Sequence, residues 1–351
     1  MKQIYFILII TAFNLIHINA QTNTVVTGVS YPYALALNGD DLYIAESSEG
    51  KISKINITEP TPTPTTVVSG LSYPTGLIVN GNELYIAESS GGKISKIDIT
   101  KSTPTAIIVV TGLNGPEGLA LNGDDLYIAE SSEGKISKIN ITEPTPTPTT
   151  VVSDLNRPEG LALNDHYLYF TENSEGKILK INITELTPTL ITLVSDLNYP
   201  TGLALKGDDL YFAEDGGVNK ISKIDITDPK PSAIDVVTGL NAPQGFTLND
   251  KHLYIADFLG HRILKFNLPI VVSVNGVVRN SILNLYPNPS NANISISNLN
   301  EEQDYNIINA IGQEVSKGVI SNNEKVDISN FANGLYFIKF KNGNTIKFIK
   351  E

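Results

Sequence analysis

The sequence predicts an all-β protein, a six-bladed β-propeller followed by a small immunoglobulin-like β-sandwich. Three observations support this prediction. A unit of about 42 residues recurs six times, each unit holds short β-branched runs separated by Asn-Gly and Gly-rich turns, and the composition changes after the last unit. We assign residues 21–274 to the propeller, 275–281 to a polar linker and 282–351 to the sandwich.

An aliphatic pair marks each repeat. The pairs are Val25-Val26, Val67-Val68, Val109-Val110, Val151-Val152, Leu193-Val194 and Val236-Val237, at spacings of 42, 42, 42, 42 and 43 residues. Residues 38–66 and 122–150 are identical at all 29 positions, which indicates a recent duplication. Six copies of one unit predict a repeat architecture.

Each unit contains four runs that are typical of strands. In the second unit these runs are 76–79, 84–87, 94–99 and 107–110. Asn-Gly turns between β-branched runs indicate hairpins. Four strands of about 5–6 residues with their turns fill one unit, which is the size of a propeller blade.

The order of the strands favours a closed ring. The central strands are apolar at consecutive positions, as at 42–45, which predicts burial on both faces. An open solenoid would also bury both faces, but it needs atypical capping repeats. The chain starts with an outer strand at 24–27 and the last unit stops at 266–268, so the first strand can complete the sixth blade, although 270–274 competes for that place.

Composition and the N-terminus bear on location and partners. The formal net charge of −12 argues against nucleic acid as a partner, and the absence of cysteine excludes disulfides. Residues 1–20 read as a secretory signal peptide, with an apolar stretch at 4–16 and cleavage between Ala20 and Gln21. No later apolar run approaches the ~20 residues of a membrane span. We expect a secreted or cell-surface monomer.

The last unit resembles a known repeat. Residues 254–257 (Tyr-Ile-Ala-Asp), followed by 260–266 (Gly-His-Arg-Ile-Leu-Lys-Phe), resemble an NHL-type repeat, and the Pro-x-Gly opening of each unit fits it. The wider relatives are the YWTD and gluconolactonase-like six-bladed propellers, and the likeness covers about 23–268. This resemblance implies the fold more than the function, because such propellers include lyases, lactonases and binding modules.

The C-terminal region resembles the type A sorting domain of the Bacteroidetes type IX secretion system. The resemblance rests on segments 285–289, 308–315, 333–339 and 347–350. It implies recognition by an outer-membrane translocon; the alternative is an ordinary appended immunoglobulin-like domain. We expect Gly312 and Gly334 at turns where a side chain would clash. The motif residues are Pro287, Asn288, Pro289, Gly312, Gly334, Tyr336, Lys347 and Lys350.

Catalytic signatures are missing from the sequence. It contains no HExxH, GxSxG, P-loop or GxGxxG motif. His166 and His252 align with one turn of the repeat and His261 with a loop at the opposite end of the blade, so the three histidines cannot share a site. We therefore predict no catalytic residues and no metal ligands.

A carboxylate ends the second strand of every unit. Six such groups around an axis could bind Ca²⁺. A structural role is favoured, because each blade needs acceptors for backbone N–H groups in the loop between its second and third strands, so no cofactor is predicted. The residues are Glu46, Glu88, Glu130, Glu172, Glu214 and Asp257.

Candidate ligand-binding residues lie where the repeats differ, in the loops that lead into each Pro-x-Gly. They are Tyr31, Tyr33, Tyr73, Glu117, Arg157, Glu159, Tyr199 and Gln244. Tyrosines beside carboxylates and an arginine suit a glycan or a peptide, although the tyrosines could instead fill contacts between blades. We predict a non-catalytic module that binds an extracellular glycan or protein. The alternative is a metal-dependent lactonase or lyase that uses Glu117, Glu159 and Asn173.

Overall fold

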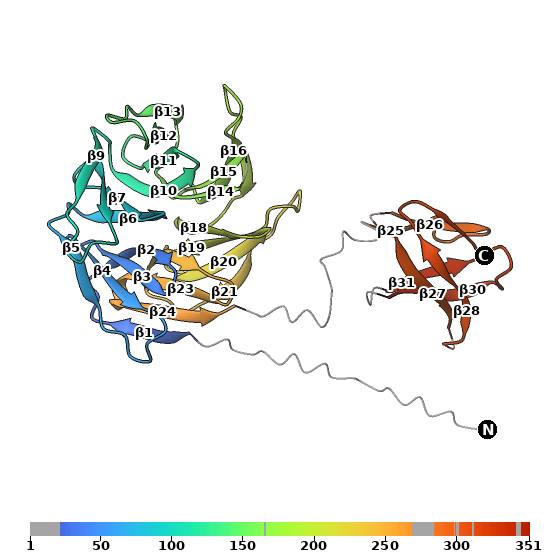
Figure 1. Cartoon of the computed structure of the whole chain (residues 1–351). Coiled ribbons are helices and arrows are strands. Elements are labelled where there is room, and N and C mark those ends of the chain that lie inside the picture. Colours follow the sequence, from blue (N-terminus) through green and yellow to red (C-terminus); the bar gives the residue numbers. More distant parts are fainter. Residues whose placement is uncertain are drawn as a thin grey trace, which may run out of the picture. The chain divides into compact units, whose positions relative to one another are not determined.

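The computed structural model describes residues 22–164, 166–268, 284–297, 299, 302–310, 312–341 and 345–351. They form two compact units, one with strands β1–β24 and one with strands β25–β31 (Figure 1). The predicted signal peptide with Ala20 and Gln21, the linker 275–281 and the competing segment 270–274 lie outside the described residues.

Six four-stranded antiparallel sheets build the first unit. The first blade contains β2 (Pro32–Asn38), β3 (Asp41–Glu46), β4 (Lys51–Asn56) and β5 (Thr65–Ser69). The second contains β6 (Pro74–Asn80), β7 (Glu83–Glu88), β8 (Lys93–Asp98) and β9 (Ile107–Thr111). The third contains β10 (Pro116–Asn122), β11 (Asp125–Glu130), β12 (Lys135–Asn140) and β13 (Thr149–Val152).

The remaining three blades repeat this order. The fourth contains β14 (Pro158–Asn164), β15 (Tyr167–Glu172), β16 (Lys177–Asn182) and β17 (Ile191–Val194). The fifth contains β18 (Pro200–Lys206), β19 (Asp209–Glu214), β20 (Lys220–Asp225) and β21 (Ile234–Val237). The sixth contains β22 (Pro243–Leu248), β23 (His252–Asp257), the short 3₁₀ helix η1 (Phe258–Gly260), β24 (Arg262–Asn267) and β1 (Asn23–Thr27).

The ring is closed. The innermost strand of each blade contacts the innermost strand of the next blade, and β22 of the sixth blade contacts β2 of the first. The N-terminal strand β1 pairs with β24, with Asn23 opposite Lys265 and Thr27 opposite Arg262. Figure 1 shows β1 beside β24, so the first and last parts of the propeller share one sheet.

Local sequence explains the hairpins and the core. Asn38 pairs with Asp41 across a two-residue turn, and Gly39 in this turn has a φ of +60°, the left-handed region that glycine enters without strain. The second strand of each blade is buried over five of its six residues, and buried clusters join adjacent blades. Ring neighbours therefore cover both faces, and each buried leucine or isoleucine contributes about 1.5–3 kcal/mol.

The glycine of Pro-x-Gly allows neighbouring blades to approach closely. A Cβ at this position would overlap the backbone carbonyl group of the next blade, as with Gly118 against Glu159 and Gly160 against Thr201. The expectation that each unit opens with Pro-x-Gly was wrong for the first blade, which alone carries an alanine here, Ala34. The motif therefore reflects packing between the innermost strands.

The six repeated carboxylates bond within their own blades, but the predicted partners were wrong. Each accepts a backbone N–H from the loop that precedes the first strand, not from the loop between the second and third strands. In the first blade the donor to Glu46 is Ser30 at 2.7 Å, and in the third the donor to Glu130 is Asn114 at 2.9 Å. A cation from the third strand lies beside most of them, as Lys51 does at 3.4 Å from Glu46. The six carboxylates therefore join the loop before the first strand of each blade to the sheet.

Two sheets around one apolar core form the second unit, a small immunoglobulin-like sandwich. The core includes Ile294, Ile307, Ile338 and Phe348. One sheet contains β25 (Asn284–Tyr286), β26 (Asn293–Ser297) and β29 (Lys325–Asp327). The other contains β28 (Glu314–Ile320), β27 (Gln303–Asn309), β30 (Gly334–Phe340) and β31 (Thr345–Lys350).

Several sorting-motif residues join the segment after β25 and strand β30 to the last strand, β31. Pro287, Asn288 and Pro289 follow β25, and the Asn288 side chain donates to the Lys347 carbonyl at 3.2 Å and accepts from the Ile349 N–H at 2.9 Å. The Tyr336 ring stacks on Phe348 at 5.6 Å. Lys347 is exposed on β31, whereas Lys350 is buried.

The expected reason for the two motif glycines was wrong. A Cβ on Gly312 or Gly334 would meet no atom within 4 Å. Gly312 occupies the turn after β27 with a φ of +85°, so its backbone conformation, not the available space, favours glycine. Gly334 is the first residue of β30 and does not lie in a turn.

Candidate functional site

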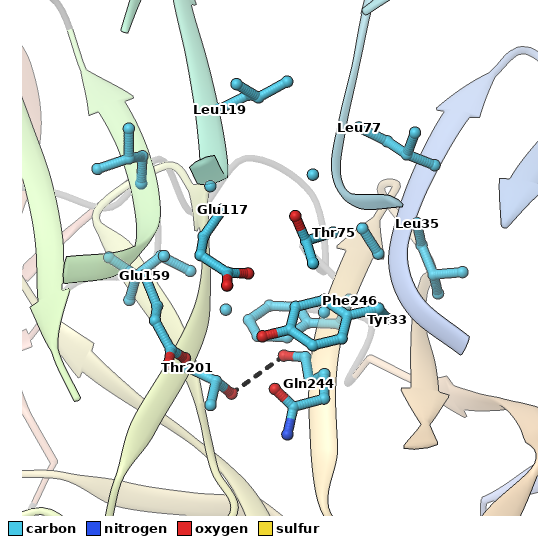
Figure 2. Close-up of a pocket in the computed structure, with 18 residues that line it drawn as sticks. Tyr33, Leu35, Thr75, Leu77, Glu117, Leu119, Glu159, Thr201, Gln244 and Phe246 are labelled. Atoms are coloured by element: carbon cyan, nitrogen blue, oxygen red, sulfur yellow. Dashed lines mark hydrogen bonds between the residues drawn. The ribbon is translucent and has the colours of Figure 1, made fainter. Parts of the chain in front are cut away.

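The candidate site lies at the end of the propeller channel where the innermost strands begin. Three positions in each blade meet there: the residue before the Pro-x-Gly proline, the x residue itself, and the first residue after the second strand. The x residues are Tyr33, Thr75, Glu117, Glu159, Thr201 and Gln244. All six line the channel, and Figure 2 shows Glu117, Glu159 and Tyr33 pointing toward the same space.

The residue before each proline has a left-handed backbone. These residues have φ between 46° and 60°, a conformation that costs a non-glycine residue about 1–2 kcal/mol. In the first five blades the first residue after the second strand helps to hold it, because its N–H donates to the carbonyl of the left-handed residue, as Ser89 does to Tyr73 at 3.0 Å. The six residues are Tyr31, Tyr73, Gly115, Arg157, Tyr199 and Ala242.

A cavity of about 360 Å³ opens at this end, and we call it the mouth pocket. This volume suits a small ligand or one unit of a longer one. Its lining brings together seven of the eight predicted residues. The lining residues are Tyr33, Tyr73, Glu117, Arg157, Glu159, Asn173, Tyr199, Asp215, Gln244 and Phe258.

Tyr31, the eighth predicted residue, is not part of this lining. Its ring packs on Phe258 at 5.1 Å and on His261 at 4.3 Å. Tyr31 therefore contacts Phe258, which lines the mouth pocket, without lining the mouth pocket itself. Whether the seven gathered residues bind a ligand stays a prediction.

Asp215 and Phe258 line the mouth pocket but were missed in the sequence. Both occupy the first position after the second strand, where three blades carry serine and the fourth carries Asn173. Divergence at this position is the same signal that identified the other candidates. The signal is present in the repeat, but at this position the prediction used it only for Asn173.

Below the mouth pocket the channel narrows to a cavity of about 100 Å³ and becomes apolar. Two residues after each x position comes a leucine or a phenylalanine. Figure 2 shows Leu77 beyond Thr75 on one innermost strand and Leu119 beyond Glu117 on the next. This apolar ring removes water from one side of the buried carboxylates. The channel below the mouth pocket is therefore narrower and more apolar than the mouth pocket itself.

Burial shifts the titration of the carboxyl groups in the mouth pocket. It raises the pKa of Glu117 to about 7, although the Tyr33 hydroxyl and the Arg157 charge both lower it. Burial, followed by the negative charge of Glu117, raises the pKa of Glu159 to about 8. Burial also raises the pKa of Asp215, against a hydrogen bond from Gln244 Nε2 to its Oδ2 at 2.6 Å.

Three buried oxygens of the mouth pocket have no hydrogen-bond partner: Glu117 Oε2, Glu159 Oε1 and Asn173 Oδ1. Arg157 Nε lies 2.9 Å from Glu159 Oε1 as an ion pair, without the alignment of a hydrogen bond. Buried acceptors without partners are uncommon in folded proteins, so each of these atoms indicates a place for a ligand, an ion or water.

Among the described residues, no group of three or more histidine, cysteine, aspartate or glutamate side chains is placed to hold a metal ion. His166, His252 and His261 contribute to neither the mouth pocket nor the channel. The oxygen atoms of Glu117, Glu159 and Asn173 remain the donor set that an ion would meet.

Fold and site together define a six-bladed propeller that carries a C-terminal β-sandwich. Residues 284–351 match the family described as the secretion system C-terminal sorting domain. The chain is therefore exported through type IX secretion to the cell surface or the extracellular space, and it interacts with that machinery. Over the residues that the structure describes, no helix is long and apolar enough to cross a membrane.

Known structures share the propeller fold. A gluconolactonase from Xanthomonas campestris is 13% identical, with a TM-score of 0.60 over 71% of this chain and 89% of that one. Virginiamycin B lyase from Staphylococcus aureus is 18% identical, with a TM-score of 0.54 over 71% and 98%. A chain of a nidogen/laminin complex is 17% identical, with a TM-score of 0.55 over 65% and 89%. No curated protein sequence matches the chain.

Proposed function

We propose that the exported propeller is a non-catalytic binding module that takes a glycan in its mouth pocket. One observation carries the proposal: the blades repeat one sequence pattern, with two of them identical over 29 residues, yet the positions that line the mouth pocket differ from blade to blade. Identity between blades maintains the fold, whereas a specific ligand needs different groups around it.

The aromatic residues of the mouth pocket are available to a ligand. The exposed fraction is 39% for Tyr73 and 54% for Tyr199, so part of each ring is open to solvent and to a ligand. A sugar ring can stack on such a face, while carboxylate and amide oxygens accept hydrogen bonds from its hydroxyl groups. Tyr31 packs on Phe258, and Tyr33 packs between Phe258 and the edge of Tyr73.

A glycan array followed by calorimetry tests this proposal. The purified chain is compared with a Tyr73→Ala/Tyr199→Ala variant, which we expect to weaken binding of any glycan found on the array at least tenfold. The matched control is Tyr167→Ala, because Tyr167 is 37% exposed and lies outside the mouth pocket. An array that shows no glycan bound at micromolar protein would refute the proposal.

The unpartnered oxygens favour a second candidate function, a metal-dependent hydrolase or lyase. Glu117, Glu159 and Asn173 would hold a divalent cation, which would polarise a carbonyl group of the substrate. Two of the structural neighbours are named as a gluconolactonase and a lyase. Metal analysis of the purified chain with a lactone-hydrolysis assay separates the two candidates, because bound metal together with turnover would replace the binding proposal.

A further inference from the structure

Four hydrogen-bond donors around the buried carboxyl groups of the mouth pocket are already in use. Gln244 Nε2 donates to Asp215, and Asn173 Nδ2 donates to Glu159 Oε2 at 3.3 Å. The Ser89 hydroxyl donates to Glu117 Oε1 at 3.3 Å, and the Tyr33 hydroxyl also bonds to the Glu117 carboxylate. Among the buried groups the open ones are therefore acceptors, while the more exposed side chains of Arg157, Tyr73 and Tyr199 carry further donors.

Those open acceptors are deeply buried. Glu117, Glu159 and Asn173 have exposed fractions of 9%, 5% and 3%, and each keeps one oxygen without a hydrogen bond, that of Glu159 being ion-paired with Arg157. Figure 2 shows the Glu117 and Glu159 carboxylates directed into the cavity. A ligand that satisfies these oxygens must bring donors, because an unpaired buried oxygen costs about 1–3 kcal/mol.

The excess of acidic side chains in the mouth pocket also favours a ligand that brings donors and positive charge. The mouth pocket contains three carboxyl groups, Glu117, Glu159 and Asp215, and one basic residue among its lining, Arg157, whose side chain is 55% exposed. The ring of Tyr33 lies 6.3 Å from that of Tyr73 and 5.8 Å from that of Phe258. Aromatic faces next to carboxylates attract a cation and disfavour an anion.

We infer that the glycan bound in the mouth pocket carries a free primary ammonium group, as an amino sugar without N-acetylation does. This inference rests on the proposed function and adds the chemical class of the ligand. The ammonium group brings three donors and one positive charge, which match the open oxygens of Glu117, Glu159 and Asn173. The sugar hydroxyls and ring then meet Tyr73 and Tyr199.

The groups that face Glu159 predict how binding depends on pH. Glu117 and Asp215 repel its charge, Arg157 attracts it, and Asn173 donates to it. An ammonium group stabilises the ionised carboxylates, so binding near pH 7 should release protons from Glu117 and Glu159. Calorimetry in two buffers with different ionisation enthalpies measures this release.

The experiment compares a glucosamine tetrasaccharide with its fully N-acetylated counterpart, using metal-free protein in EDTA. We expect the free amine to bind at least tenfold more tightly, with proton release. Glu159→Gln should remove this preference. Arg157→Gln should strengthen binding of the amine severalfold, because it removes the competing cation. The control Glu143→Gln, at an exposed residue between β12 and β13, should change neither the preference nor the affinity.

Each outcome decides between the two ideas. Equal affinity for the two tetrasaccharides would overturn the amine inference and leave glycan binding in place. If neither tetrasaccharide binds but another glycan does, the amine inference fails and glycan binding stands. If the array shows no bound glycan, both the amine inference and the proposed function fail. Binding that requires added Ca²⁺ would assign the open oxygens to a metal ion instead.

Discussion

The first and third blades share one sequence over residues 38–66 and 122–150, but they present different chemistry to the mouth pocket. Their shared parts fold alike: Lys54 lies 2.8 Å from Asp41, and Lys138 lies 2.7 Å from Asp125. The differences concentrate just before the shared region. The three informative pairs are Tyr31 and Gly115, Tyr33 and Glu117, and Ala34 and Gly118.

This comparison separates two roles within one repeat. The shared residues build the sheet and its contacts with both neighbouring blades. An equivalent substitution in either blade should therefore have the same effect on stability. Residues at the start of the innermost strand lie at the end of the channel and can vary at little cost to the sheet. We therefore expect a few positions per blade to determine the function of the propeller.

The largest expected effect concerns Glu117, which stands where the first blade has Tyr33. Its pKa is about 7 in the folded protein against an ordinary value of 4.5, so the folded state keeps a proton that the unfolded state loses between these pH values. Stability should therefore fall as pH rises from about 5 to about 8, by on the order of 3 kcal/mol for this group alone. Denaturation at several pH values measures the slope.

Glu117→Gln should reduce that slope, since it removes one of the titrating groups. Glu159, with a pKa of about 8, should account for most of what remains. The exposed-residue variant Glu143→Gln serves as the control and should leave the slope unchanged. A slope that is identical in Glu117→Gln and in the unmodified chain would contradict the assigned burial of this carboxyl group.

A smaller effect is expected at the next position, where the third blade has Gly118 and the first has Ala34. Gly118→Ala places a Cβ onto the Glu159 backbone carbonyl, so the two innermost strands must move apart. We expect a loss of about 1–3 kcal/mol in the free energy of unfolding, measured by chemical denaturation. Ala34→Gly is the reciprocal change, and a gain in stability there would show that the two blades are packed alike at this point, because it would remove an equally crowded Cβ.

Much of this structure could be predicted from the repeat alone. The spacing of the aliphatic pairs fixes the number of blades, and the position of the first strand predicts the shared sixth blade. Contacts between blades could not be predicted, because they join residues of different repeats after the ring closes. The hydrogen bond between Asp215 and Gln244 and the unpartnered oxygen of Asn173 are of this kind. The donor loop for the repeated carboxylates was missed because loop geometry has no signature in the periodicity.

The smallest expected effect concerns the residue before the proline, which is Gly115 in the third blade and Ala242 in the sixth. Ala242 has a φ of 49°, and a left-handed alanine costs about 1–2 kcal/mol, while glycine costs about 0.4–1 kcal/mol through the entropy of the unfolded chain. Ala242→Gly should therefore stabilise the propeller by about 0.5 kcal/mol, seen as a rise of about 1–2 °C in Tm. Ala45→Gly, in the buried strand β3, should lower Tm instead. If Ala242→Gly also lowers Tm, the left-handed residues around the mouth pocket are not strained, and their side chains, rather than the backbone alone, hold that conformation.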